Sequence, residues 1–268
     1  MKGLILGAGY ATRLGALTHN RPKPLLPIAD RPILDYLLDH IEQESDISEV
    51  IIVTNARFAA HFQAWQTTQK RSLSLQILDD GTTSDENKLG AIGDIRFTIQ
   101  KLHIDDDLFV IAGDNLFDFD LRPFFAACTQ RGSIVGVYDV KDITLMPQYS
   151  EVQMDHDGRI LRFVEKPKNP TTTFMAIALY AYRREHLPLL EDYARAGGNM
   201  DSPGYFPAWL SQRVAVYGHV FHGRWYDIGH IGQYREADAA WRSMRAAHQA
   251  DAFSLHHAFD QNRSPHDR

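Results

Sequence analysis

The 268-residue chain contains a single cysteine, Cys128, so no disulfide can form within it. A lone cysteine in a chain of this length is typical of a reducing compartment, and we expect Cys128 to be a small buried apolar residue. No apolar run approaches the ~20 residues that span a membrane. The first residues also lack the charged and then apolar pattern of a signal peptide. These absences predict a cytoplasmic protein that does not engage a membrane.

The sequence also lacks an excess of positive charge, internal repeats and low-complexity linkers. It has 28 Lys and Arg against 34 Asp and Glu, which gives a net charge of −6. A surface of this balance is not typical of proteins that bind nucleic acid or anionic membranes, although a local basic cluster could still bind a small anion. A hydrophobic content of 44% and a charged content of 23% are ordinary for a globular protein.

What the first half contains is an alternation of short apolar runs with segments of helical period. Such alternation predicts an α/β fold, with a mostly parallel, Rossmann-like sheet flanked by helices and ligands bound beyond the carboxyl ends of the strands. The expected strands are 2–6, 49–54, 73–78, 108–112 and 133–140, and the expected helices are 33–44, 56–67, 89–102 and 121–130.

The pattern changes after about residue 145 and becomes richer in strands. The turn sequence "DHDG" separates 149–155 from 159–164 and predicts a β-hairpin. Further strands are expected at 174–182 and 214–221, and helices at 184–195, 202–212 and 231–248. We interpret 1–248 as one domain with a β-rich extension, followed by a flexible polar tail over 249–268.

Residues 3–13, "GLILGAGYATR", read as a buried strand followed by a turn of small residues. Glycines in such a turn let backbone N–H groups approach phosphate oxygens. A dinucleotide fingerprint would place glycine at Thr12 and an acidic residue at Asn55, and a Walker A loop would contain Gly-Lys-Ser/Thr. Both of the common phosphate-binding patterns are therefore absent.

A proline-stiffened arm stands where a helix would be expected. Pro22, Pro24 and Pro27 disfavour helix and predict that Lys23 is held on an extended segment. Arg13 and Lys23 could together stabilise a polyphosphate whose charge changes during a reaction. From spacing alone, they could equally be surface cations on a stiff loop.

Three further segments carry charged side chains, and each of these could have either a functional or a purely structural role. Asp114 follows a strand in "VIAGDNLF" and could bind Mg²⁺ or form a turn. Asp227 in "GRWYDIGH" could bind the same metal or cap a helix. Glu165 and Lys166 end the hairpin and could orient a phosphorylated ligand or form an exposed strand end. The histidine pair at 219 and 222 is poorly spaced for one metal on a strand.

Together these motifs resemble the signature of the sugar-1-phosphate nucleotidyltransferases. The resemblance rests on "GAGYATRL", the "LT" at 17–18, "RPKPLLPI" and "RPILDYLL", and it extends to about residue 240. Ala11 stands where many members have glycine, and Gly7 where they have alanine. The resemblance implies the nucleotide-diphospho-sugar transferase fold, with nucleotide bound by 1–140 and sugar phosphate by 141–248.

The resemblance also implies a role for each candidate. Arg13 and Lys23 would be catalytic, and Asp114 and Asp227 would hold Mg²⁺. Tyr149, Ser150, Glu165, Lys166 and Tyr180 would bind the sugar phosphate. Ser150 and Glu151 depart from the usual pattern, in which glycine and an apolar residue stand there. The nucleotide would lie against Leu6, Gly7, Ala8, Gly9, Tyr10, Ala11, Thr12, Gly90 and Asp114.

The function that the resemblance implies is transfer of a nucleotidyl group from an NTP to a sugar 1-phosphate, with release of pyrophosphate. Glucose 1-phosphate with dTTP or UTP is the first expectation. CTP, or a mannose- or muramate-type acceptor, is the alternative within the family. A catalytically silent nucleotide-sugar sensor and an NAD(P)-dependent oxidoreductase are the rivals outside it. A homo-oligomer is compatible with the resemblance.

Overall fold

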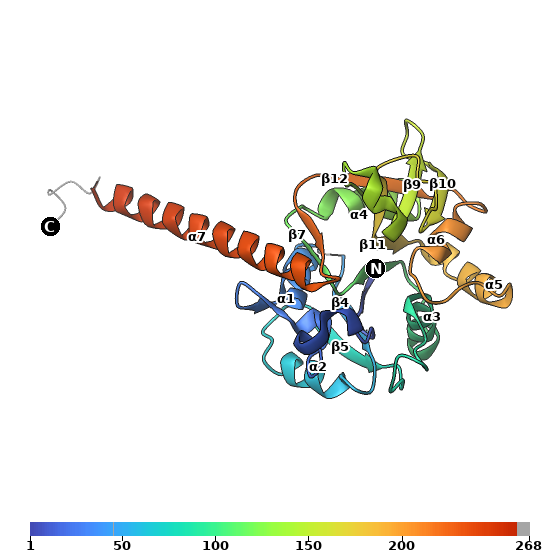
Figure 1. Ribbon diagram of the computed structural model, residues 1–268, viewed down its shortest axis with the longest axis horizontal. Coiled ribbons are helices and arrows are strands. Elements are labelled where there is room, and N and C mark those ends of the chain that lie inside the picture. The colour runs from blue at the N-terminus through green and yellow to red at the C-terminus, as the bar shows by residue number, and fades with distance from the viewer. Residues whose placement is uncertain (45, 262–268) are drawn as a thin grey trace.

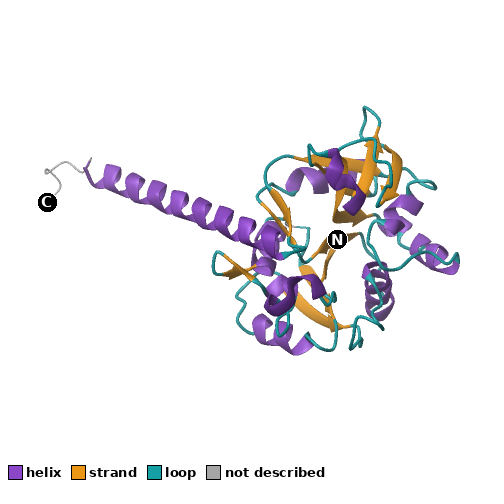
Figure 2. Ribbon diagram, viewed as in Figure 1, coloured by secondary structure: helices purple, strands orange, loops and turns teal. Residues whose placement is uncertain are grey.

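The computed structural model describes residues 1–44 and 46–261, apart from the side chains of Thr12 and of residues 248–261. Four strands of the first half pair in parallel in the order β6 (Leu108–Ala112), β1 (Lys2–Leu6), β4 (Glu49–Thr54) and β5 (Ser74–Asp79). Their apolar runs are buried because helices cover both faces, as Figure 2 shows. The expected α/β fold is confirmed.

Alternate residues of β1 and β4 point into two different cores. Ile5 and Ile52 pack with α1 (Ile33–Ile41), α2 (Ala59–Gln66) and α4 (Arg122–Arg131) on one face. Leu4 and Ile51 pack on the other face with α3 (Ala91–Leu102), α5 (Leu189–Arg195) and α6 (Tyr205–Leu210). Phe58, Phe62 and Trp65 of the α2 region are buried in the first core, and Cys128 is buried there as expected.

Strand β11 (Phe174–Tyr182) joins the two halves of the chain in one sheet. It runs antiparallel to β6 and also pairs with β8 (Ile134–Asp139) and β9 (Ser150–Met154). The expected hairpin is present as β9 and β10 (Ile160–Glu165), and β12 (Tyr217–Phe221) extends the sheet beside β8. The register of β11 shifts near Ala178, whose φ of 51° is left-handed, so the strand kinks where it borders the central cavity.

Two short ladders lie outside the large sheet. Strand β2 (Pro27–Ile28) pairs with β3 (Arg31–Pro32) on the arm, and β7 (Asn115–Phe117) pairs with β13 (Trp225–Asp227). The remaining elements are four 3₁₀ segments among the described residues: η1 (Thr12–Leu17), η2 (Lys23–Leu25), η3 (Ile143–Gln148) and η4 (Arg184–His186). The β7–β13 ladder joins segments far apart in the sequence, and it positions two of the candidate site residues.

The last element, α7 (Ile231–Gln261), begins on the body and projects away from it (Figure 1). Ala237 and Trp241 are buried in a third apolar cluster, with Ile28 and Ile228. The helix continues through 249–261, where the sequence contains several alanines and neither glycine nor proline. The flexibility of this tail stays a prediction. Residues 262–268 lie outside the described part. Among the described residues, no helix combines the length and apolar character needed to cross a membrane.

Candidate active site

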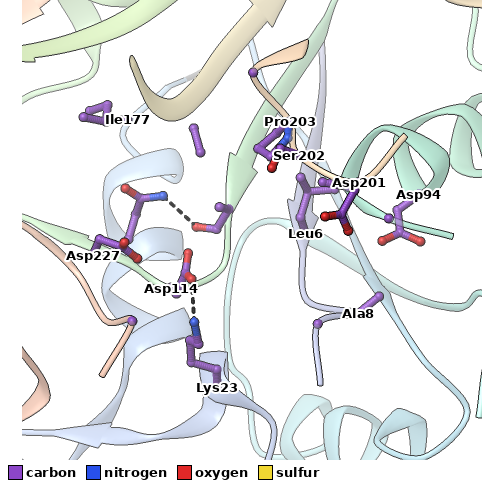
Figure 3. A pocket seen from close by; sticks show the side chains of 18 of the residues that line it. Leu6, Ala8, Lys23, Asp94, Asp114, Ile177, Asp201, Ser202, Pro203 and Asp227 are labelled. Carbon is purple, nitrogen blue, oxygen red and sulfur yellow. Dashed lines mark hydrogen bonds and ion pairs between the residues drawn. The ribbon is translucent and has the colours of Figure 1, made fainter. Parts of the chain in front are cut away.

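A cavity of roughly 480 Å³ lies at the carboxyl ends of β1 and β6, and both halves of the chain line it. Figure 3 shows Lys23, Asp114 and Asp227 gathered on one side of this cavity and Asp94 and Asp201 on the other. Leu6 and Ala8 lie between the two groups. The cavity therefore has two chemically different ends, connected by the turn that follows β1.

The turn after β1 is fixed by hydrogen bonds from the neighbouring strand. The Gly7 N–H donates to the Val53 carbonyl over 2.8 Å, and the buried Asn55 Nδ2 donates to the Ala8 carbonyl over 2.7 Å. A Cβ on Gly9 would meet nothing within 4 Å, so this part of the turn is open to a ligand. Ala11 has a φ of 50°, which glycine would adopt more easily. The prediction at Thr12 concerns a side chain outside the described set.

The two predicted cations reach the same end of the cavity. Arg13 is exposed and lines the cavity, and the Lys23 Nζ donates to Asp114 Oδ2 over 2.8 Å. The prediction that Lys23 lies on an extended segment was only partly correct. Lys23 begins the 3₁₀ turn η2, and extended residues Pro22 and Leu26 flank this turn. Pro24 is tolerated because the first N–H groups of such a turn need no internal partner.

Asp114 and Asp227 are brought together by the β7–β13 ladder. Asp227 pairs in register with Asn115, and the Ile228 N–H donates to the Asp114 carbonyl over 3.1 Å. Burial and, after it, the nearby Asp114 charge raise the pKa of the Asp227 carboxyl to about 7, against the opposing charges of Lys23 and Arg13. Two acidic groups in this environment stay ionised together only when positive charge is close.

These two carboxylates fit the ligand set that Mg²⁺ prefers. Mg²⁺ is commonly bound by one or two carboxylates and completes its shell with phosphate oxygens and water. No group of three or more His, Cys, Asp or Glu side chains among the described residues could hold a metal by itself. A cation at Asp114 and Asp227 would therefore depend on ligands that a phosphorylated substrate supplies.

The side predicted to bind the sugar phosphate is formed by the hairpin and by α6. The Ser150 hydroxyl donates to Glu165 Oε2, and both groups face Gly204, where a Cβ would collide with them. Lys166 is exposed in a left-handed conformation, and its N–H donates to the Tyr149 carbonyl over 2.9 Å. Both Glu165 and Lys166 line the cavity. Tyr180 also borders it, but this side chain is almost wholly buried and stacks on Tyr182.

Glu151, the second departure from the family pattern, is fully buried and does not line the cavity. Its Oε1 accepts from the Thr171 N–H at 2.7 Å and from the Thr172 N–H at 3.1 Å, and its Oε2 accepts from Arg162 at 2.9 Å. Burial would raise the pKa of Glu151, but these hydrogen bonds hold it below its ordinary value. Glu151 therefore anchors the 166–173 loop rather than facing a ligand.

Gly90 lies at the other end of the cavity, directly before α3. Its φ is 80°, and a Cβ there would come within 2.7 Å of the Asp201 Cα. The Ala91 and Ile92 N–H groups donate to the carbonyls of Asp201 and Met200, each over 2.9 Å. Glycine is therefore required both by the backbone conformation and by the close approach of the 200–201 segment.

Several residues that support the site were not predicted from the sequence. Asn55 fixes the turn after β1, and the Asn115 Oδ1 accepts from the Trp225 Nε1 over 2.6 Å. Gln233 links the Gly229 N–H to the Tyr149 hydroxyl. Amides of this kind act through partners distant in sequence, so spacing alone does not single them out. Gly204 had a weak signal in its "SPG" turn.

Residues 2–243 match the protein family described as nucleotidyl transferase. Similar proteins include a UTP–glucose-1-phosphate uridylyltransferase from Synechocystis sp., with 28% identity over 88% of this chain and 62% of that protein. A glucose-1-phosphate adenylyltransferase from Fervidobacterium nodosum is 26% identical over 88% of this chain and 60% of its own length. The chain thus spans about three fifths of the length of these relatives.

Solved structures show the same fold. A UDP-glucose pyrophosphorylase, complexed with UDP-glucose, superposes with a TM-score of 0.76 over 91% of this chain and 98% of that one. The sequence identity is 20%, so the likeness is one of fold.

Proposed function

This chain belongs to the nucleotidyl transferase family, and from that premise we propose that it transfers a nucleotidyl group from an NTP to a sugar 1-phosphate with the help of Mg²⁺. The observation that carries the proposal is the meeting of Arg13, Lys23, Asp114 and Asp227 at one end of a cavity that Glu165 and Lys166 also line. Phosphoryl-type transfer needs positioning and charge stabilisation rather than a protein nucleophile.

In the proposed reaction, a phosphate oxygen of the sugar 1-phosphate attacks the α-phosphorus of the NTP. The bond between the α-phosphorus and the bridging oxygen breaks, and pyrophosphate leaves with that oxygen. Arg13 stabilises the departing pyrophosphate, and Lys23 stabilises the charge at the α-phosphate. Lys166 and Glu165 orient the acceptor through its phosphate and hydroxyls.

Asp114 and Asp227 would hold Mg²⁺, which would supply positive charge that neutralises the substrate phosphates. Asp227 ends β13 and Asp114 directly precedes β7, so the β7–β13 ladder holds the two carboxylates near each other. The turn after β1 would support the triphosphate through its backbone N–H groups.

The resemblance favours glucose 1-phosphate as acceptor, and both relatives described above carry that substrate in their names. The names differ in the nucleotide, since one is a uridylyl- and the other an adenylyltransferase. Family membership therefore does not select the base. The sequence resemblance favours dTTP or UTP, whereas the side chains at the other end of the cavity favour a different base.

Pyrophosphate release tests the proposal, with ATP, GTP, CTP, UTP and dTTP each paired with a panel of sugar 1-phosphates and Mg²⁺. We expect one pair to be turned over, and we expect Asp114→Asn or Arg13→Ala to lower kcat by about 100-fold or more without a matching loss of stability. Asp120→Asn is the control, because Asp120 is an exposed carboxylate paired with Arg122. Tight nucleotide-sugar binding without turnover would instead identify a sensor.

A further inference from the structure

The end of the cavity away from Asp114 and Asp227 is lined by acidic side chains that the proposed reaction does not use, among them Asp80 and Asp94. Asp80 follows β5 and Asp94 lies in the first turn of α3, and both line the cavity with Tyr10 and Gly90. Under the proposed function, on which this inference rests, the phosphates and the acceptor occupy the opposite end. The base of the NTP is the part left to meet Asp80 and Asp94.

Asp94 is an unusual residue to find buried. It is only 6% exposed, and its Oδ1 has no hydrogen-bond partner. Leaving a buried polar atom unpaired is costly, so such an atom in a cavity wall points to a missing ligand group.

Asp80 presents a second unpaired oxygen beside it. The Asp80 Oδ1 accepts from the Thr82 N–H and the Thr82 hydroxyl, each over 2.7 Å, whereas the buried Oδ2 has no partner. Burial, and after it the charge and closeness of the Asp80 carboxyl group, raise the pKa of Asp94 to about 8. A protonated Asp94 offers one O–H donor, and the remaining carboxyl oxygens of the two residues are acceptors.

The pair is held in place by the surrounding backbone. The Thr82 hydroxyl lies 3.1 Å from the Tyr10 hydroxyl, and the Asp80 N–H donates to the Thr54 carbonyl over 2.8 Å. The Asp94 N–H donates to the Gly90 carbonyl over 2.8 Å. A preorganised donor–acceptor pair of this kind can distinguish ligands by the pattern on their edges.

We propose that Asp80 and Asp94 read the base of the NTP, and that they select a base with an exocyclic amino group next to a ring nitrogen that carries no hydrogen. Cytosine and adenine have this edge. The amino group would donate to the Asp80 carboxyl group, and the Asp94 O–H would donate to the ring nitrogen. Uracil and thymine carry the reverse order on this edge, a carbonyl oxygen beside a ring N–H, and guanine carries a hydrogen on the ring nitrogen beside its amino group.

The first test is kcat/KM for the five NTPs with the wild-type enzyme and its best sugar 1-phosphate. We expect CTP or ATP to exceed UTP and dTTP by about 10- to 100-fold, which is the effect of leaving one or two buried polar groups unpaired. Asp94→Ala should remove most of that preference, chiefly by lowering kcat/KM for CTP and ATP. Asp79→Ala is the matched control, because Asp79 is exposed and does not line the cavity.

A binding measurement separates this proposal from the proposed function. Calorimetric titration of CMP, AMP, UMP, dTMP and GMP into the wild-type protein needs no turnover, and we expect CMP or AMP to bind at least tenfold more tightly than UMP and dTMP. That ranking without any turnover would support the base selection and contradict the proposed function. Efficient turnover with preference for UTP, dTTP or GTP would support the proposed function and overturn the base selection.

Discussion

Asn55 connects the turn after β1 to the start of α2. Its Nδ2 donates to the Ala8 carbonyl, and its Oδ1 accepts from the Phe58 N–H over 3.1 Å. The side chain is wholly buried, so a replacement that cannot donate leaves the Ala8 carbonyl without that bond.

We expect Asn55→Asp to lower the free energy of unfolding by about 1–3 kcal/mol and to raise KM for the NTP more than it lowers kcat. The aspartate keeps the acceptor for Phe58 but loses the donor for Ala8. Urea denaturation and steady-state kinetics check both parts. The control is Asn169→Asp, an exposed position; unchanged KM in Asn55→Asp would show that the turn does not depend on this bond.

Asp94 also affects stability, and the sign follows from its raised pKa. The ordinary value of 3.8 applies in the unfolded chain and a value of about 8 in the folded protein. Between these values the folded state binds a proton that the unfolded state has released. The free energy of unfolding therefore falls as pH rises from about 4 to about 8.

Asp94→Asn removes that proton binding, so the variant should match the wild type near pH 4 and exceed it by about 1–3 kcal/mol near pH 8. Denaturation by urea at the two pH values measures the difference. Asp79→Asn, at an exposed carboxylate, should show no such change. An equal effect of Asp94→Asn at both pH values would mean that Asp94 is ionised throughout.

At the scale of elements, the large sheet was predictable and the small ladders were not. Strands such as 49–54 are continuous apolar runs, and burial on both faces produces that pattern whatever the neighbouring strand is. The β7–β13 ladder has three residues on each side, and its partners are about 110 positions apart in the sequence, so periodicity gives no signal. Asp114 and Asp227 were identified by resemblance, whereas their pairing required the structure.

The positions at which helices begin and end were also not predictable from the sequence alone. The segment expected as a helix over 184–195 is split into η4 and α5, with Pro188 before α5. The helix expected from 89 begins at Ala91, because Gly90 is left-handed and its neighbours donate to the 200–201 carbonyls. Such boundaries depend on contacts with residues distant in the sequence, so local helix propensity does not predict them.

The loop from Lys166 to Thr173 depends on the buried carboxylate of Glu151. We expect Glu151→Gln to lower the free energy of unfolding by about 1–3 kcal/mol and to raise KM for the sugar phosphate, because Lys166 lies at the start of this loop. Thermal denaturation and acceptor titration test this, with Glu185→Gln as an exposed control. A normal KM in a destabilised variant would separate the loop from substrate binding.

The pH dependence of the Glu151 anchor has the opposite sign to that of Asp94. Hydrogen bonds hold the pKa of Glu151 below its ordinary value of 4.5, so its contribution is present above that pH. The contribution is lost as pH falls toward the lower value in the folded protein. Acid should therefore loosen this loop.

At the scale of the whole molecule, α7 connects the arm to the end of the cavity that contains Asp114 and Asp227. Trp241 packs edge-on against Tyr36 at 6.3 Å and against Tyr226 at 5.7 Å, and Tyr226 precedes Asp227 on β13. Asp238 Oδ1 accepts from the Ala29 N–H over 2.7 Å. The start of α7 is thus part of the body, although the helix projects beyond it (Figure 1).

We expect Trp241→Ala to lower the free energy of unfolding by about 3–5 kcal/mol, because it removes a large buried side chain between two tyrosines. Turnover at saturating substrate should also fall, since Tyr226 loses its packing beside Asp227. Urea denaturation and kcat measure the two effects, and Arg235→Ala on an exposed face of α7 is the control. A stable variant would show that α7 is dispensable for the body.

The pairing of β7 with β13 has a consequence for the order of synthesis. A nascent chain that has reached residue 220 contains the turn after β1, the arm and Asp114, but not Asp227. Such a fragment would possess most of the groups predicted to bind the nucleotide and would lack the second carboxylate. We therefore expect a ribosome-bound intermediate to be catalytically inert until translation has passed β13.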